Sequence, residues 1–252
     1  MTGVALITGG QKGIGLGVAQ ALVSAGWHVA LAASSDANSD GAQTALETLG
    51  PQARYYQHDM RHIDGISALL DQIETAQGPV RSLISNAGVS VRKRGDLLDV
   101  APADYDHTVD INLRGGFFLA QAVARRMLAQ PSQSYRSLVF VTSVSAQMVS
   151  IERAEYCISK AGASMMAQLF AARLAAEDIG VFEVRPGLTE TAMTAGSKDA
   201  FSKRIDAGLV PAARWGQPSD IANCVLPLVS GQMKFANGAV IPADGGLSIN
   251  RL

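Results

Sequence analysis

The sequence is short of three kinds of feature, and each shortage excludes a class of protein. Only two cysteines, Cys157 and Cys224, occur in 252 residues, so we expect no disulfide framework. We therefore expect a reducing, cytoplasmic setting. No apolar run approaches the roughly 20 residues that span a bilayer, and the opening "MTGVALITGG" lacks the pattern of a signal peptide. The net charge of −1 creates no field that would attract nucleic acid or an anionic membrane. We therefore expect neither nucleic acid nor a membrane as a partner.

The chain also lacks a linker and a convincing metal cluster. No Pro/Ser-rich stretch divides it and no repeat of solenoid length occurs, so we expect a single domain over residues 1–252. His58 and His62 are four residues apart, a spacing that suggests a metal pair, but the surrounding "YYQHDMRHID" offers no further ligand cluster. The residues therefore predict no metal site.

Short apolar runs alternate regularly with longer helical patterns. Strands are expected at residues 4–8, 28–34, 53–59, 81–88, 137–143, 180–187 and 238–246. Helices are expected at residues 16–26, 39–50, 64–77, 103–130, 154–178 and 219–230, the fourth being one helix or two broken near "INLRGG". This alternation indicates an α/β fold: a doubly wound, Rossmann-type parallel sheet of about seven strands with helices on both faces.

In such a sheet, ligands bind beyond the carboxyl ends of the strands, where the strand order reverses. The unusual polar residues of this chain follow the expected strands, at residues 8–15, 59, 86–88, 143 and 186–191. Because the carboxyl ends of parallel strands share one edge, we expect the functional site along that edge.

The first of these segments, "TGGQKGIG" (8–15), follows a strand and opens a helix. Gly9, Gly13 and Gly15 allow a tight turn and a close approach to a pyrophosphate, whose charge the helix N-terminus faces. A tight turn alone is the alternative, but the strand before and the helix after favour a dinucleotide site.

The end of the second expected strand bears on the choice of dinucleotide. An acidic residue there would bind the ribose 2′-hydroxyl of NAD and repel the 2′-phosphate of NADP. The strand ends "AASS", and the first carboxylate, Asp36, comes two to three residues late. Ser34 and Ser35 can donate hydrogen bonds to a phosphate, and Lys12 can supply positive charge. The alternative is that the two serines only cap a turn and that Lys12 is a solvated loop residue. NADP(H) is therefore favoured, while a loop shift that brought Asp36 to the ribose would favour NAD(H).

Tyr156 and Lys160 lie four residues apart in "AEYCISKAG" and so share one face of a helix. Reduction of a ketone needs a proton donor beside the carbonyl oxygen and stabilisation of the charge that develops there. A free tyrosine is a poor acid near neutral pH, and a cation within a few ångströms favours its ionised form. The pair fits that need, although Y-x-x-x-K alone is common and is usually a surface pair.

Taken in order, the motifs make the chain similar to the short-chain dehydrogenase/reductase family, in its compact branch. They are "TGGQKGIG" (8–15), "HD" (58–59), "SNAG" (85–88), "INLRG" (111–115), "VTS" (141–143), "YCISK" (156–160), "RPGLTETAM" (185–193) and "DGG" (244–246). The resemblance covers nearly the whole chain, and its final part is most similar to 3-oxoacyl-(acyl-carrier-protein) reductases and their relatives.

The resemblance implies an NAD(P)-dependent oxidoreductase that interconverts a ketone and a secondary alcohol by hydride transfer. Tyr156 would be the general acid or base, and Lys160 would promote its ionisation and hold the nicotinamide ribose. Ser143, thirteen positions before the tyrosine, would orient the substrate oxygen. Asn112 would hold a water that links Lys160 to solvent.

The resemblance also implies contacts along the cofactor. Asp59 would accept a hydrogen bond from the adenine, although alone it would suggest only a helix N-cap, and Thr191 would reach the nicotinamide carboxamide. The expected cofactor residues are Gly9, Gln11, Lys12, Gly13, Ile14, Gly15, Ser34, Ser35, Asp59, Met60, Asn86, Ala87, Gly88, Tyr156, Lys160, Pro186, Gly187, Thr189 and Thr191.

Substrate contacts are expected from Ser143, Ser145, Met148 and Met193, with residues 188–214 as a lid. A 3-oxoacyl thioester fits the resemblance, and a polyol, sugar or other small alcohol is the alternative. The added "QPSQSY" (130–135) departs from the carrier-protein reductases and argues against a basic docking patch there. The family commonly pairs the 103–130 and 154–178 helices, which implies a homotetramer or, failing that, a dimer.

Two other classes remain open. A regulator that binds a dinucleotide without turnover would have no need of the complete Ser-Tyr-Lys-Asn set. A nucleotide-sugar epimerase or dehydratase is usually longer and carries T-G-x-x-G-x-x-G, which "TGGQKGIG" does not match.

Overall fold

The computed structural model describes residues 3–130 and 134–251, and within them seven strands form one parallel sheet. The strands are β1 (Val4–Thr8), β2 (His28–Ala33), β3 (Ala53–Gln57), β4 (Val80–Ser85), β5 (Arg136–Val141), β6 (Ile179–Pro186) and β7 (Val240–Ala243). Their order is β3-β2-β1-β4-β5-β6-β7. The order reverses between β1 and β4, so the expected doubly wound fold and its switch point are confirmed.

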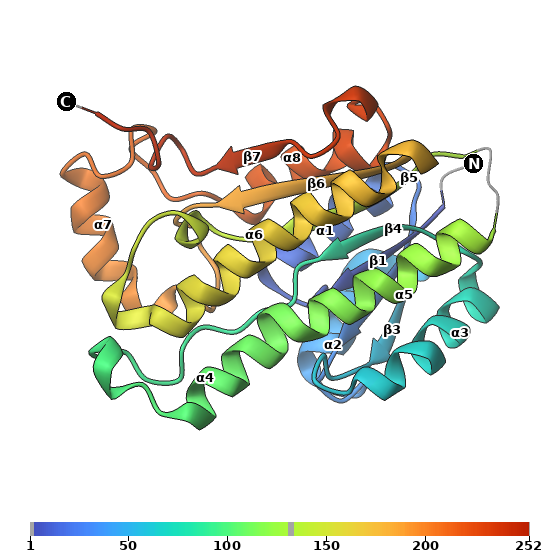
Figure 1. The fold of residues 1–252 in the computed structure, drawn as a ribbon, viewed down its shortest axis with the longest axis horizontal. Helices are drawn as coiled ribbons and strands as arrows, with labels where there is room; N and C mark the ends of the chain where they lie inside the picture. The colour runs from blue at the N-terminus through green and yellow to red at the C-terminus, as the bar shows by residue number, and fades with distance from the viewer. Residues whose placement is uncertain (1–2, 131–133, 252) are drawn as a thin grey trace.

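Helices cover both faces of the sheet, which is why its inner strands are almost wholly apolar. On one face lie α1 (Gly13–Ser24), α2 (Asp40–Leu49) and α8 (Pro218–Val229), and on the other α3 (Ile66–Gln77), α5 (Gly116–Ala129) and α6 (Ala154–Leu174). Figure 1 shows α5 and α6 lying side by side in front of the strands. Each face therefore has its own hydrophobic core.

The segment expected as one long helix or two is continuous but irregular. It runs as α4 (Pro102–Val109), a π-helical turn over Asp110–Gly115, and then α5. π turns inside longer helices are rare and occur frequently at functional sites. The break expected near "INLRGG" is thus a π-helical turn within a continuous helical segment.

Two other segments need separate mention, one because it differs from the expectation and one because the structure describes it only in part. The segment expected as a lid contains a helix, α7 (Lys198–Asp206), that the sequence did not indicate. Of the added "QPSQSY", residues 131–133 lie outside the described residues. Beside it, Arg126 forms ion pairs with Asp71 and Glu74 at 2.7 Å each, so its charge is already compensated.

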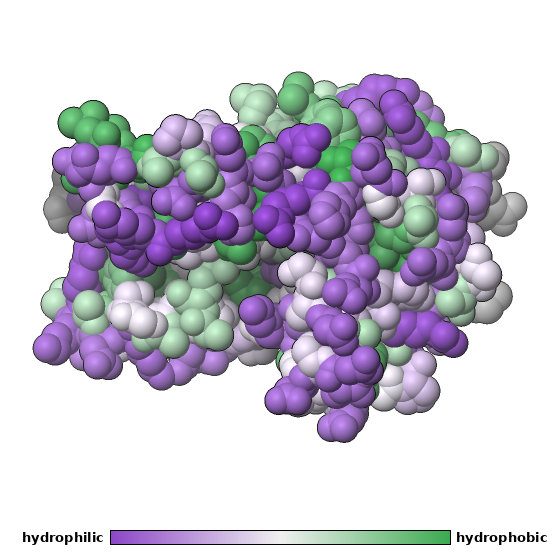
Figure 2. Space-filling model, turned by 90° about the horizontal axis from the view of Figure 1, so that it is seen from below, coloured by the Kyte–Doolittle hydropathy of each residue, from purple (hydrophilic) through white to green (hydrophobic). Residues whose placement is uncertain are grey.

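The carboxyl ends of the strands define one side of the molecule. The arrowheads of β6 and β7 point to the left of Figure 1, and α7 lies on that side. Figure 2, turned about the horizontal axis, shows a recess in its left half with hydrophobic residues at the floor and a hydrophilic band above. Among the described residues, no helix is long and apolar enough to cross a membrane.

Candidate active site

The glycine loop between β1 and α1 is shaped by close backbone contacts. Gly9 and Gly13 have φ angles of 66° and 54°, which residues with a Cβ rarely adopt. A Cβ on Gly15 would lie 2.3 Å from the carbonyl oxygen of Gly9. A Cβ on Gly13 would lie 3.3 Å from Cγ2 of Thr191, so this loop faces the segment after β6. The first and sixth strands thus bring the two expected cofactor segments together.

Thr8, at the end of β1, ties this loop to the "SNAG" segment after β4. Its buried hydroxyl oxygen accepts hydrogen bonds from the backbone N–H groups of Asn86 and Ala87, each at 2.9 Å. The Asn86 side chain donates back to the Thr8 carbonyl oxygen at 2.9 Å. The sequence analysis did not single out Thr8 by itself, and here the Asn86 side chain stabilises the loop.

Several features of this edge fit a dinucleotide. The N-terminus of α1 has no side-chain cap and no acidic residue in its first turn, so its N–H groups can receive an anion. The side-chain oxygens Oε1 of Gln11 and Oγ1 of Thr189 are buried without a hydrogen-bond partner. Because buried polar atoms are normally satisfied, these two atoms indicate a ligand that would complete them.

Asp59 and Met60 follow β3, where the adenosine half was expected. Asp59 accepts hydrogen bonds from the backbone and guanidinium of Arg61, with 2.6 Å between Oδ2 and Nη2. The Arg61 hydrogen bond lowers the pKa of Asp59 to about 2. Met60 is buried, and a Cβ on Gly115 would lie 2.2 Å from its carbonyl oxygen. Met60 therefore also supports the π-helical turn.

The end of β2 carries no carboxylate, as expected. Ser34 is exposed, whereas the Ser35 hydroxyl contacts the Tyr55 hydroxyl at 2.7 Å. Asp36 turns back to accept a hydrogen bond from the Asn38 N–H at 2.7 Å. In this arrangement, Asp36 stabilises its own turn.

The π-helical turn places Asn112 beside the "SNAG" segment. Oδ1 of Asn112 accepts from the Val89 N–H at 2.8 Å, and its amide donates to the Val89 carbonyl and to Oγ of Ser159 at 3.0 and 3.1 Å. A Cβ on Gly88 would lie 3.2 Å from Oδ1 of Asn112 and 3.5 Å from Nζ of Lys160. Gly88 therefore lies close to both side chains, and a Cβ there would crowd Oδ1 of Asn112.

Tyr156 and Lys160 are buried on the first turns of α6. The Lys160 ammonium lies 5.7 Å from the Tyr156 ring centroid and donates to the Val141 carbonyl oxygen at 3.2 Å. That bond holds the lysine at the end of β5, next to the segment that contains Ser143. Tyr156 and Lys160, which the sequence predicts to be neighbours on one helix face, thus also lie at the carboxyl edge of the sheet.

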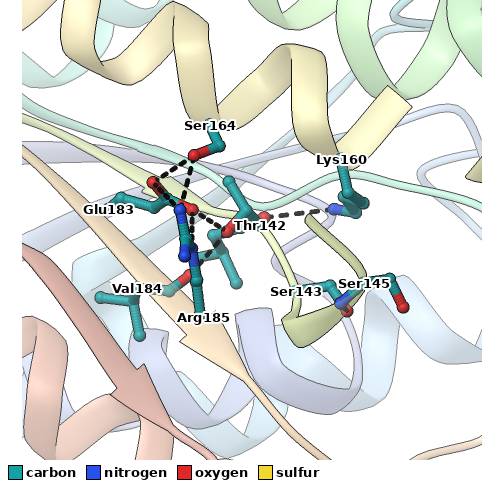
Figure 3. Close-up of polar contacts among 9 residues, drawn as sticks. Thr142, Ser143, Ser145, Lys160, Ser164, Glu183, Val184 and Arg185 are labelled. Atoms are coloured by element: carbon teal, nitrogen blue, oxygen red, sulfur yellow. Dashed lines mark hydrogen bonds and ion pairs between the residues drawn. The ribbon is translucent and has the colours of Figure 1, made fainter. Parts of the chain in front are cut away.

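Ser143 and Ser145 are buried in the turn that follows β5. The Ser143 hydroxyl oxygen accepts from the Ser145 N–H at 3.1 Å. Figure 3 shows both serines below the Lys160 side chain, which reaches down from α6. Ser143, Tyr156, Lys160 and Asn112 are therefore brought to one edge of the sheet from three separate elements.

A buried ion pair under this site escaped the sequence analysis. Glu183 and Arg185, two residues apart on β6, join at 2.6 Å. Glu183 also accepts from the hydroxyls of Thr142 at 2.6 Å and Ser164 at 2.8 Å, as Figure 3 shows. Thr142 precedes Ser143, and Ser164 lies one helical turn beyond Lys160. The carboxylate therefore joins the two elements that carry Ser143 and Lys160.

Arg153 was also missed. Its guanidinium lies 5.3 Å from the Tyr156 ring centroid and donates to Oγ of Ser145 at 3.3 Å and to Oγ of Ser150 at 3.4 Å. Its position three residues before the tyrosine was the available signal.

The expected substrate methionines are more open than the serines. Met148 is 39% exposed and Met193 is 53% exposed. The segment that contains Met193 rests on a small cluster of its own, in which Ile205 and Val210 pack with Leu247. Gly187, at its start, approaches Asp244 so closely that a Cβ would lie 2.7 Å from the aspartate Cβ. Among the described residues, no group of three or more His, Cys, Asp or Glu side chains is placed to hold a metal.

Comparison with known proteins gives one consistent family. A sequence model described as Enoyl-(Acyl carrier protein) reductase matches residues 9–248. The 3-oxoacyl-(acyl-carrier-protein) reductase MabA of Mycobacterium tuberculosis is 33% identical over 247 residues, 97% of this chain and 92% of that protein. The 2-dehydro-3-deoxy-D-gluconate 5-dehydrogenase of Escherichia coli is 30% identical over 246 residues, 96% of this chain and 94% of that protein.

A solved structure agrees with this assignment. The 3-oxoacyl-(acyl-carrier protein) reductase from Brucella melitensis in complex with NAD is 42% identical, with a TM-score of 0.95, and the match covers 100% of this chain and 99% of that one. The chain therefore belongs to the short-chain dehydrogenase/reductase family of NAD(P)-dependent oxidoreductases.

Proposed function

We propose that Tyr156, Lys160, Ser143 and Asn112 carry the ketone–alcohol chemistry of this oxidoreductase. This is supported by three observations: Asn112 and Lys160 both lie next to Gly88, Lys160 lies beside the Tyr156 ring, and Ser143 stands in the turn after β5, whose last residue accepts the Lys160 hydrogen bond. A dinucleotide-binding regulator would have no use for a proton donor held against a buried lysine.

A bound nicotinamide supplies the hydride in reduction and accepts it in oxidation. In reduction, the Tyr156 hydroxyl gives its proton to the carbonyl oxygen while the new C–H bond forms, which leaves a phenolate and an alcohol. The Lys160 ammonium stabilises that phenolate, and the Ser143 hydroxyl orients the substrate oxygen. Asn112 holds the Val89 backbone in place, and we assign it the water that returns a proton through Lys160.

For the substrate, we propose the 3-oxo group of an acyl thioester first and a sugar or polyol second. The likeness to MabA and to the Brucella reductase supports the first, and the likeness to the gluconate dehydrogenase supports the second. Consumption of reduced nicotinamide with acetoacetyl thioesters, ketones and sugars tests both. Absence of turnover with every ketone and alcohol would contradict the enzymatic role itself.

For the cofactor, we propose a preference for NADP(H) over NAD(H). It is supported by the exposed Ser34, the lack of a carboxylate at the end of β2 and the exposed Lys12 in the glycine loop. Steady-state KM values for NADPH and NADH should favour NADPH, and Lys12→Gln should narrow the difference. A lower KM for NADH would contradict the preference and would agree with the NAD in the Brucella structure.

For the location, we propose a reducing, cytoplasmic setting, which the free thiols of Cys157 and Cys224 support.

We propose that residues 188–214 close over the substrate. α7 is joined to the body of the protein by few buried side chains, and Trp215 holds it through a 3.0 Å hydrogen bond to Ser202. Low stability of this kind is typical of lids. Hydrogen exchange in this segment should slow when cofactor and substrate analogue bind together, and unchanged exchange would contradict closure.

We also propose assembly into a homotetramer, or a dimer, through α4, α5 and α6. These helices form an open apolar groove of about 390 Å³ that includes Phe117 and Phe118. Met165 and Leu169, on its α6 wall, are 55% and 60% exposed in the monomer. Apolar patches of this kind mark protein interfaces. Leu169→Glu should lower the mass seen by analytical ultracentrifugation, whereas the exposed Gln72→Glu on α3 should not.

A further inference from the structure

Arg153 brings a second positive charge to the catalytic tyrosine. It is the last residue before α6, and its guanidinium lies 5.3 Å from the Tyr156 ring centroid, close to the 5.7 Å of Lys160. The phenol ring therefore has two cations beside it. Lys160 is accounted for by its bond to the Val141 carbonyl and by its part in proton transfer, whereas Arg153 has no such task.

Arg153 forms no ion pair with any residue that the structure describes. Its two hydrogen bonds go to the neutral hydroxyls of Ser145 and Ser150, at 3.3 and 3.4 Å. Within residues 3–130 and 134–251, no carboxylate lies within ion-pair distance of it, although Glu152 and Glu155 flank it in sequence. A partly buried guanidinium normally pairs with an anion, and its planar fork suits the two oxygens of a carboxylate.

The position of Arg153 is one that a substrate would reach. Ser145 lies two residues after Ser143 in the turn that faces Tyr156, and it accepts the hydrogen bond from Nη2 of Arg153. A carbonyl bound between Ser143 and Tyr156 would thus lie near the Arg153 guanidinium. Both hydrogen bonds of Arg153 are long, so an anionic group can replace them at little cost.

We propose that Arg153 binds an acid group of the substrate, so that among small free substrates the enzyme prefers oxo acids or hydroxy acids to neutral ketones. The acid group would lie a few bonds from the reacting carbon, because Arg153 contacts the Tyr156 ring and also Ser145, two residues after Ser143. This inference rests on the proposed function, since it assumes that Tyr156 and Ser143 hold the reacting carbonyl. It makes Arg153 a specificity-determining residue.

The test compares acetoacetate with its neutral ethyl ester, which share one carbon skeleton and one reacting ketone. The wild type should have the higher kcat/KM for the acid. Arg153→Gln should raise KM for acetoacetate by roughly 10- to 100-fold, the effect of losing a charged hydrogen bond, and change KM for the ester by less than about twofold. Arg153→Lys should keep part of the preference, because it keeps the charge without the fork. Arg173→Gln, at the far end of the same helix, is the control and should change the KM for neither substrate.

Binding without turnover gives a second readout. Butyrate lacks the oxo group, so its inhibition of ester reduction reports only on the acid subsite, and Arg153→Gln should weaken that inhibition by at least about tenfold. Equal losses of kcat for acid and ester in Arg153→Gln would show that Arg153 only positions Tyr156, and would overturn the inference. So would a wild-type preference for the ester. If the wild type reduces neither compound nor any other ketone, the proposed function fails as well, whereas turnover of the ester alone refutes only the acid subsite.

Discussion

Replacing Glu183 by glutamine should destabilise the protein strongly, because the carboxylate is the centre of a buried network. Its side chain is 1% exposed and that of Arg185 is 10% exposed. Glutamine has nearly the same shape but no charge, so it leaves the Arg185 guanidinium without a counter-ion in the interior. It also adds a donor group where Thr142 and Ser164 donate their hydroxyls.

The size of the effect follows from the burial. Breaking a buried ion pair by removing one partner costs about 3–5 kcal/mol, because an uncompensated charge remains. For a chain of this length, each kcal/mol shifts the melting temperature by about 2–4 °C, so Glu183→Gln should lower it by roughly 6–20 °C. Scanning calorimetry at a fixed protein concentration measures the shift. The kcat should fall too, because Thr142 and Ser164 fix the elements that carry Ser143 and Lys160.

An exposed ion pair on the same protein is the matched control. Arg214 and Asp220 join at 2.7 Å with side chains 57% and 37% exposed, so Arg214→Gln should cost at most about 1 kcal/mol. The double variant Glu183→Gln/Arg185→Gln should recover part of the lost stability, because no unpaired charge remains. A melting temperature of Glu183→Gln no lower than that of Arg214→Gln would refute the reasoning.

Three further changes have separate expected outcomes. Gly15→Ala should weaken dinucleotide binding by at least about tenfold in a fluorescence titration, because its Cβ would lie 2.3 Å from the Gly9 carbonyl oxygen. The carboxyl of Asp59 should titrate near 2 by NMR, so its stabilising effect is complete above the unfolded value of about 3.8 and is lost as pH falls through about 2. Arg61→Gln should return that pKa toward 3.8. Cys157→Ala should leave kcat within about twofold, since its thiol makes only long contacts of 3.8 and 4.0 Å.

Controls and contrary results are available for each of these. Gly41→Ala, where a Cβ meets nothing within 4 Å, should leave dinucleotide affinity unchanged. A dinucleotide affinity of Gly15→Ala equal to that of the wild type would show that the glycine loop does not form the dinucleotide site. An Asp59 that titrates near 3.8 would show that Arg61 does not hold it in solution. A large loss of kcat in Cys157→Ala would give the thiol a role beside Tyr156.

The sequence predicted the sheet because apolar runs and glycine turns are local signals. Every expected strand occurs, and "TGGQKGIG" forms the expected turn between β1 and α1. The helix α7 was missed because its nine residues include five charged groups and little periodic apolar content, so its packing against Leu247 decides its structure. Local pattern cannot reveal a helix that distant contacts stabilise.

The residues of the candidate site that belong to sequence motifs were predictable. The buried charged residues beside them were not. Tyr156 and Lys160 share a helix face, so spacing alone placed them together. Glu183 and Arg185 stand in a strand that otherwise looks fully apolar, and only the fold shows that Ser164 and Thr142 meet them. Arg153 escaped because its partner ring is set by the turn before α6, which the sequence did not define.

The most direct test of the account is the turnover of Tyr156→Phe. The variant keeps the ring and loses only the proton donor, so its cofactor affinity should stay within about twofold of the wild type. The rate at which it consumes reduced nicotinamide with a reactive ketone should fall by about 10²- to 10⁴-fold, the usual contribution of a general acid. A rate within about tenfold of the wild type, with cofactor affinity unchanged, would contradict the claim that Tyr156 donates the proton.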